Sequence, residues 1–159
     1  MSGPIPNHLI RSDVKKAYDT MAPTYTAWTQ PTHETRLRYL KALLGALGED
    51  ETITVLELGC GAGVPCTGFM ASRPNIKVTA NDISDAQIAL ARQRLPPSVE
   101  IAPRDMVEWE FDVARFDGVV GMYSLFHLPR DEQTVMLRRI FWLVEAWWSI
   151  VGKIYGGRV

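Results

Sequence analysis

The chain has 159 residues, of which 47% are hydrophobic and 22% charged, with a formal net charge of -1 at pH 7. This length and composition predict one globular domain, and the near-neutral charge gives no electrostatic reason to expect nucleic acid as a partner. The polar N-terminus predicts no signal peptide, and no apolar run approaches the ~18 residues that span a bilayer. Two cysteines, Cys60 and Cys66, make no metal cage. We therefore expect no metal, no membrane partner and a cytoplasmic location.

Two helices are predicted ahead of the main alternation of elements. Residues 1–11 are expected to form a loose arm. Ser12 can cap a helix that runs to about Met21 with one apolar face, and Pro23 ends it. A second helix is predicted over 32–47, with leucines along one stripe and Gly48 at its C-terminal cap.

Strands and helices then alternate. Strands are predicted over 52–58, 76–81, 99–102 and 116–122, and helices over about 65–72, 84–95 and 130–140, with a turn or short helix at 105–112. Ser84 and Gln87 form a capping box at the start of one helix. The alternation predicts an α/β fold with a doubly wound parallel sheet, whose ligands bind at the carboxyl ends of the strands. Strand 52–58 is expected beside the point where the strand order reverses.

A glycine-rich run follows this strand and is the most informative motif. The sequence Glu57-Leu58-Gly59-Cys60-Gly61-Ala62-Gly63 places three glycines at alternate positions. Glycine in a strand-to-helix turn lets bare backbone approach a ligand, and Glu57 offers a partner for a positive group. Together they predict a nucleoside ligand with a cationic end. Position 64 is valine, so the G-x-G-x-x-G dinucleotide fingerprint is absent and an NAD-type oxidoreductase is the second choice.

The run resembles the nucleotide loop of class I S-adenosylmethionine-dependent methyltransferases, whose signature is an acidic residue, any residue and alternate glycines. The resemblance covers roughly residues 12–140. It implies a Rossmann-like sheet with an N-terminal helical lid and S-adenosyl-L-methionine as the cofactor. The loop residues expected to contact the cofactor are Glu57, Gly59, Cys60, Gly61 and Gly63, with Glu57 serving its ammonium group directly or through water.

Residues after the next two strands match the same family. Asp82, at the end of the second strand, would accept the ribose hydroxyls, and Ile83 would pack on the adenine. Asp105 would hold the adenine amino group, and Met106 would cover the ring. The alternatives are that Asp82 only begins the next helix, where its charge suits the helix dipole, and that Asp105 is an ordinary loop residue.

The remaining candidates come from the fourth strand and the lid. The family often shows a histidine near the end of the loop after the fourth strand, and His127 matches it. His127 could act as a general base, or only fix the loop and line the pocket. Tyr123 has the same two interpretations, and the backbone at Met122 is expected to contact the cofactor. Tyr18 and Tyr25 would close over the methionine end of the cofactor, or simply pack the lid helices.

The resemblance ends after Ile140. The family continues with a basic-Pro-Gly-Gly turn into a fifth strand, whereas residues 141–159 here hold three of the five tryptophans. We therefore expect one domain made of a lid (1–48), a cofactor-binding core (49–140) and an atypical aromatic tail (141–159), truncated so that the C-terminal strands are missing or replaced. Residues 150–155 are a weak candidate for a fifth strand. The open edge of the fourth strand and the tail would suit self-association or a partner.

The expected reaction is direct methyl transfer from the sulfonium to a nucleophile on a small molecule. By analogy with lid-bearing members of the family, that molecule is expected to be a specialised metabolite or a peptide natural product. The alternatives are a truncated relative that binds the cofactor but is inactive or needs a partner, and an NAD-type oxidoreductase fragment. Titration with S-adenosylmethionine and with NAD separates the oxidoreductase alternative from the other two hypotheses. A turnover assay separates the active methyltransferase from the inactive or partner-dependent relative.

Overall fold

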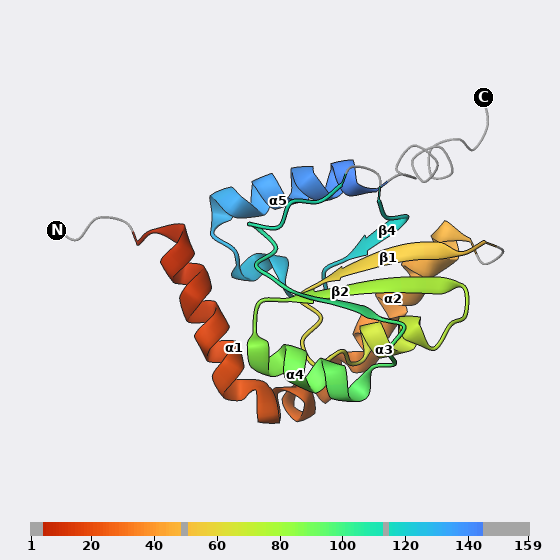
Figure 1. Ribbon diagram of the computed structural model, residues 1–159, viewed down its shortest axis with the longest axis horizontal. Coiled ribbons are helices and arrows are strands. Elements are labelled where there is room, and N and C mark those ends of the chain that lie inside the picture. The colour runs from red at the N-terminus through yellow and green to blue at the C-terminus, as the bar shows by residue number, and fades with distance from the viewer. Residues whose placement is uncertain (1–4, 49–50, 113–114, 145–159) are drawn as a thin grey trace.

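A single parallel sheet organises the computed structural model, which describes residues 5–48, 51–112 and 115–144 (Figure 1). The strands are β1 (Ile53–Leu58), β2 (Ile76–Asp82), β3 (Glu100–Pro103) and β4 (Gly118–Val120). Their order in the sheet is β3-β2-β1-β4, and every pairing is parallel. The strand order thus reverses beside β1. The predicted doubly wound parallel sheet is confirmed.

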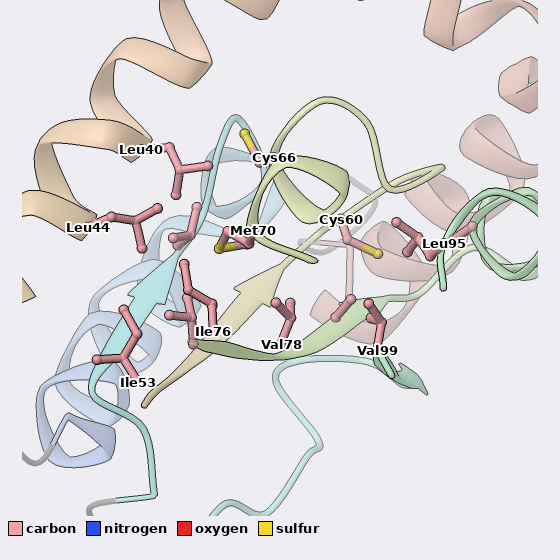
Figure 2. Close-up of a cluster of buried hydrophobic side chains, with 14 of the residues drawn as sticks. Leu40, Leu44, Ile53, Cys60, Cys66, Met70, Ile76, Val78, Leu95 and Val99 are labelled. Carbon is pink, nitrogen blue, oxygen red and sulfur yellow. The ribbon is translucent and has the colours of Figure 1, made fainter. Parts of the chain in front are cut away.

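Helices cover both faces of this sheet. One face carries α2 (His33–Leu47), α3 (Cys66–Ala71) and α4 (Asp85–Arg94), and the other carries α5 (Arg130–Leu143). Neighbouring residues of β1 point to opposite faces, so Val55 packs in the first core and Leu56 in the second. Figure 2 shows the first core, where Leu40 and Leu44 of α2 lie over Met70 and the strand side chains. Burial on both faces explains why β1 has apolar residues on both of its sides, whereas β2 is apolar only on the side that faces the first core, at Ile76, Val78 and Ala80.

Helix α1 (Asn7–Thr29) differs most from its prediction. It begins at Asn7 and passes through Pro23, so the expected loose arm was wrong over 7–11 and the expected stop at Pro23 was wrong. A proline inside a helix costs about 3 kcal/mol, because it lacks a backbone donor and crowds the preceding turn. Contacts along the helix offset that cost: Arg11 binds three carboxylates, and the Asp19 carboxylate accepts from Ala86 N at the start of α4.

Four local details also depart from the predicted elements. The capping box is only half made: Ser84 Oγ accepts from Gln87 N at 3.2 Å, but Ser84 N donates to Asp82 Oδ1 instead of to the Gln87 side chain. Pro65 is the N-cap of α3 rather than a residue inside it. β4 is shorter than 116–122, and α5 continues past Ile140 to Leu143.

Just before β4, the chain is paired on its outer side at a single described position. Phe116 forms an isolated parallel bridge with Val144, directly after α5. The predictions for the aromatic tail beyond that point, including a strand over 150–155, lie outside the described residues. Within the described residues, no helix combines the length and apolarity needed to cross a bilayer.

Candidate functional site

The carboxyl ends of the strands open into a cavity that α1 covers. The cavity holds about 820 Å³ of empty space, including the part open to solvent. Helix α1 crosses this end of the sheet between α4 and α5 (Figure 1). All predicted site residues except Glu57 and Gly63 line the cavity: Tyr18, Tyr25, Gly59, Cys60, Gly61, Asp82, Ile83, Asp105, Met106, Met122, Tyr123 and His127.

The three glycines of the β1–α3 loop have different surroundings. All have a positive φ, +72° at Gly59, +55° at Gly61 and +80° at Gly63. A Cβ on Gly59 would lie 2.3 Å from Ser124 Cβ, and one on Gly63 would lie 2.7 Å from Leu95 Cδ1. On Gly61 the nearest atom, Gln87 Oε1, would be 3.7 Å away. Gly59 and Gly63 therefore serve close packing, while Gly61 leaves bare backbone beside the cavity.

Asp82 closes β2 and holds the glycine loop in position. Its Oδ2 accepts from Gly61 N at 2.8 Å and its Oδ1 accepts from Ser84 N at 2.9 Å. Burial raises the pKa of the Asp82 carboxyl, and the hydrogen bonds from Ser84 and Gly61 oppose that rise. The result is a buried carboxyl group at the cavity wall, with further lone pairs that can accept from ligand hydroxyls.

The loop after β3 is fastened from two helices. Asp105 Oδ1 accepts from Val107 N at 2.9 Å, and its Oδ2 accepts from Arg11 Nε of α1 at 2.6 Å. Arg139 of α5 donates to the carbonyl oxygens of Val107 and Trp109. Asp105 and the apolar Met106 are thereby presented to the cavity side by side.

Glu57 and Gly63 are the two predicted residues that do not line the cavity. The Glu57 side chain turns toward α3, where its Oε2 accepts from Thr67 Oγ1 at 2.6 Å. Burial raises the pKa of the Glu57 carboxyl to about 7, although the Thr67 hydrogen bond and the charge of Arg36 lower it. Glu57 therefore lies behind the cavity wall, where it supports the loop from below.

The lid and the loop after β4 meet through a hydrogen bond. Tyr18 Oη and His127 Nε2 are 2.7 Å apart, and the Tyr18 and Tyr25 rings pack edge to face at 5.2 Å between centroids. Burial raises the pKa of the Tyr18 hydroxyl and lowers the pKa of His127. Both shifts favour the neutral forms, and the direction of the bond then follows the ring tautomer of His127: Tyr18 donates to Nε2 when the ring proton is on Nδ1.

Arg36 is a site residue that the sequence reasoning missed. It lines the cavity from α2 and is only 9% exposed, yet its guanidinium has no hydrogen bond or ion pair among the described residues. Its nearest aromatic contact is the Tyr123 ring, 4.9 Å from the centroid, and Tyr123 itself has a positive φ of 64°. A signal was present, because Arg36, Leu40 and Leu44 follow one another at i+4 on the buried helix face.

The cavity therefore combines groups suited to a nucleoside with a carboxylate. Asp82 and Asp105 can accept hydrogen bonds from hydroxyl and amino groups, and Ile83 and Met106 can flank a flat ring. Arg36, which has no ion pair among the described residues, can bind an anion. These residues fit the predicted cofactor. No cluster of three or more metal-ligating side chains occurs in the part of the chain that the structure describes.

Comparison with known proteins gives a family match for this chain. The model of a family described as a methyltransferase domain matches residues 55–146, more than half of the chain. A ubiquinone biosynthesis O-methyltransferase of Alkalilimnicola ehrlichii is 35% identical over 104 residues, 63% of this chain and 40% of that protein. A trans-aconitate 2-methyltransferase of Variovorax paradoxus is 33% identical over 101 residues, 63% of this chain and 38% of that protein. The chain thus spans less than half the length of these curated relatives.

A solved structure shares the fold. The 1,6-didemethyltoxoflavin-N1-methyltransferase of Burkholderia thailandensis, crystallised with 1,6-didemethyltoxoflavin and S-adenosylhomocysteine, has a TM-score of 0.69 and 24% identity. The similarity covers 91% of this chain and 62% of that one. The likeness extends over the lid as well as the sheet.

Proposed function

Because this chain belongs to the family of class I S-adenosylmethionine-dependent methyltransferases, we propose that it binds S-adenosylmethionine in the cavity under α1 and methylates a small molecule. One observation carries the proposal beyond family membership. The guanidinium of Arg36, whose buried Nε has no hydrogen-bond partner among the described residues, shares a cavity with the Asp82 carboxyl and the bare backbone of Gly61. This combination suits a nucleoside joined to an amino acid carboxylate.

In this proposal each end of the cofactor has its own set of residues. Asp82 accepts from the ribose hydroxyls, and Asp105 accepts from the adenine amino group. Ile83 and Met106 pack on the ring. Arg36 binds the carboxylate, and a guanidinium can do so through two parallel hydrogen bonds. Glu57 reaches the ammonium group only through intervening atoms, since its carboxyl is bound to Thr67.

Bound S-adenosylmethionine supplies a methyl group on a positively charged sulfur, which is a good leaving group. The protein then needs mainly to align the acceptor and exclude water, and α1 with Tyr18 and Tyr25 forms the cover that does so. For an acceptor that must lose a proton, His127 in the tautomer with a free Nε2 is the proposed base, reached through the Tyr18 hydroxyl that lies 2.7 Å from that nitrogen. Tyr123 is proposed to align the acceptor.

The acceptor class is the less constrained part of the proposal. We favour a specialised metabolite or peptide natural product. The two curated relatives differ in their names, since one is named for ubiquinone biosynthesis and the other for trans-aconitate. A second candidate is a relative that binds the cofactor without turnover on its own. It is favoured by β4, which is the outermost strand of the sheet among the described residues.

Calorimetric titration of the purified chain with S-adenosylhomocysteine and with NAD tests the binding part. We expect S-adenosylhomocysteine to bind and NAD not to bind; tight NAD binding alone would overturn the proposal. Transfer of labelled methyl from S-adenosylmethionine to a panel of small hydroxyl, amine and carboxylate acceptors tests the reaction. Cofactor binding without transfer to any acceptor would favour the second candidate.

A further inference from the structure

Arg11 of α1 makes a buried charge cluster at one end of the cavity. Its three guanidinium nitrogens each meet a different carboxylate. Nε binds Asp105 Oδ2 at 2.6 Å, Nη2 binds Glu108 Oε1 at 2.9 Å, and Nη1 binds Glu132 Oε1. The Arg11 side chain is only 9% exposed. A buried guanidinium whose three nitrogens each bind a carboxylate from two other segments restrains those carboxylates, although Glu108 is itself 69% exposed.

Asp105 is the partner for which this fixing matters to a ligand. Arg11 and Asp105 both line the cavity, whereas Glu108 and Glu132 do not. Val107 N holds the other Asp105 oxygen, so the carboxylate is restrained from two sides. Burial lowers the pKa of Arg11, but the hydrogen bonds and charges of Asp105 and Glu132 raise it by more, so Arg11 remains a cation.

We propose that Arg11 is a specificity-determining positioning residue, which holds Asp105 as a fixed acceptor so that the site selects adenine over hypoxanthine. The inference rests on the proposed function, in which Asp105 faces the adenine amino group. Adenine presents an N–H donor at that position and hypoxanthine presents a carbonyl oxygen. A rigid carboxylate attracts the first and repels the second, whereas a mobile one can turn away from the oxygen.

A purely structural role for Arg11 predicts something different. If Arg11 only fastens α1, its loss weakens every ligand under the lid by the same factor. The loop itself has an independent anchor, because Arg139 binds the carbonyls of Val107 and Trp109. Loss of Arg11 should therefore free the Asp105 side chain without releasing the loop backbone.

The test compares S-adenosylhomocysteine with S-inosylhomocysteine, its hypoxanthine analogue, by calorimetry. We expect the unaltered chain to prefer S-adenosylhomocysteine by roughly 100-fold, and Arg11→Gln to reduce that preference at least about 5-fold. Arg11→Met is a second variant, and circular dichroism establishes which of the two is folded. Glu108→Gln is the matched control, because it removes another Arg11 partner and leaves the Asp105 contact; it should keep the full preference.

The outcomes separate the inference from the function beneath it. Equal weakening of both ligands in the Arg11 variants would overturn the specificity role and leave cofactor binding intact. Binding of neither ligand to the unaltered chain would instead overturn the proposed function. A preference lost equally in Glu108→Gln would show that the whole charge cluster, and not the Asp105 contact, sets the selectivity.

Discussion

Single residues of the glycine loop can be told apart by what a methyl group would meet. Gly59 and Gly61 share a left-handed backbone, which costs a non-glycine residue about 1–2 kcal/mol. Only at Gly59 would a Cβ also run into the buried Ser124, whose Oγ donates to Leu58 O at 2.6 Å. Substitutions at these two positions therefore separate an effect on packing from an effect on ligand binding.

We expect Gly59→Ala to lower the free energy of unfolding by about 1–3 kcal/mol more than Gly61→Ala, because its methyl group displaces Ser124 and with it the loop after β4. Gly61→Ala should remain folded but bind S-adenosylhomocysteine roughly 10-fold more weakly, since its methyl group enters the space beside the ligand. Urea unfolding and calorimetry measure the two effects. Unchanged affinity in Gly61→Ala would mean that this backbone does not approach the cofactor.

The role of Arg36 can be tested with two ligands: S-adenosylhomocysteine carries an amino acid carboxylate and 5′-methylthioadenosine does not. Arg36→Met should weaken S-adenosylhomocysteine about 10- to 100-fold, since a charge-assisted contact contributes ~1.5–3 kcal/mol. It should leave 5′-methylthioadenosine, which lacks the amino acid end, nearly unaffected. Arg38→Met is the control, as Arg38 lies on the exposed face of the same helix. Equal losses for both ligands would contradict the assignment of Arg36 to the carboxylate.

At the scale of elements, the sequence predicted what depends on neighbours along the chain. β1 was recognisable because both its faces are apolar, and α2 because Leu40, Leu44 and Gly48 mark its face and its end. The extent of α1 was not predictable from local rules. Pro23 signals a stop, and it is overridden by contacts to residues far along the chain, such as Arg11 to Glu132, which are 121 positions apart.

The junction of β1 and α3 gives an element-scale prediction. The pKa of the Glu57 carboxyl is raised to about 7 from 4.5, so folding favours its protonated form and this stabilisation is lost as pH rises from about 4.5 to 7. Glu57→Gln keeps a neutral acceptor for Thr67 at every pH. Relative to the unaltered chain, the variant should therefore gain stability between pH 5 and pH 7.5, by up to the order of 3 kcal/mol. Urea unfolding at the two pH values measures it, and a constant difference would contradict it.

At the scale of the whole molecule, the candidate site is a seam between the sheet and the helices α1 and α2. The sheet half, with Asp82 and Asp105 at strand ends, followed from the sequence because parallel strands bring their carboxyl ends together. The helical half did not, since Arg11 and Arg36 have the residue type of a solvated helix face and gain meaning only from what they meet across the seam. For Arg36 the i, i+4 spacing to the buried Leu40 was a sign in the sequence. Arg11 lacks such a sign, because the next buried residue of α1 is Ala22.

This seam predicts that the cofactor controls the opening of α1. Among the residues of α1 only Arg11, Ala22 and Thr29 are buried, and Leu9, Met21 and Trp28 are exposed, so the helix is held largely by polar contacts and should open at low free energy. A ligand enclosed beneath it must leave before the helix opens fully. With S-adenosylhomocysteine at 100 times its dissociation constant, backbone hydrogen exchange over 7–29 should slow by up to about 100-fold.

Hydrogen–deuterium exchange followed by mass spectrometry measures this effect. Peptides that cover α5 are the internal reference, because no residue of this helix lines the cavity. Hydrogen exchange in these peptides should slow much less. Slowing confined to the glycine loop, with exchange over 7–29 unchanged, would mean that the ligand binds without engaging α1. In that case α1 would be a fixed wall of the site rather than its lid, and the acceptor would have to enter by the part of the cavity that is open to solvent.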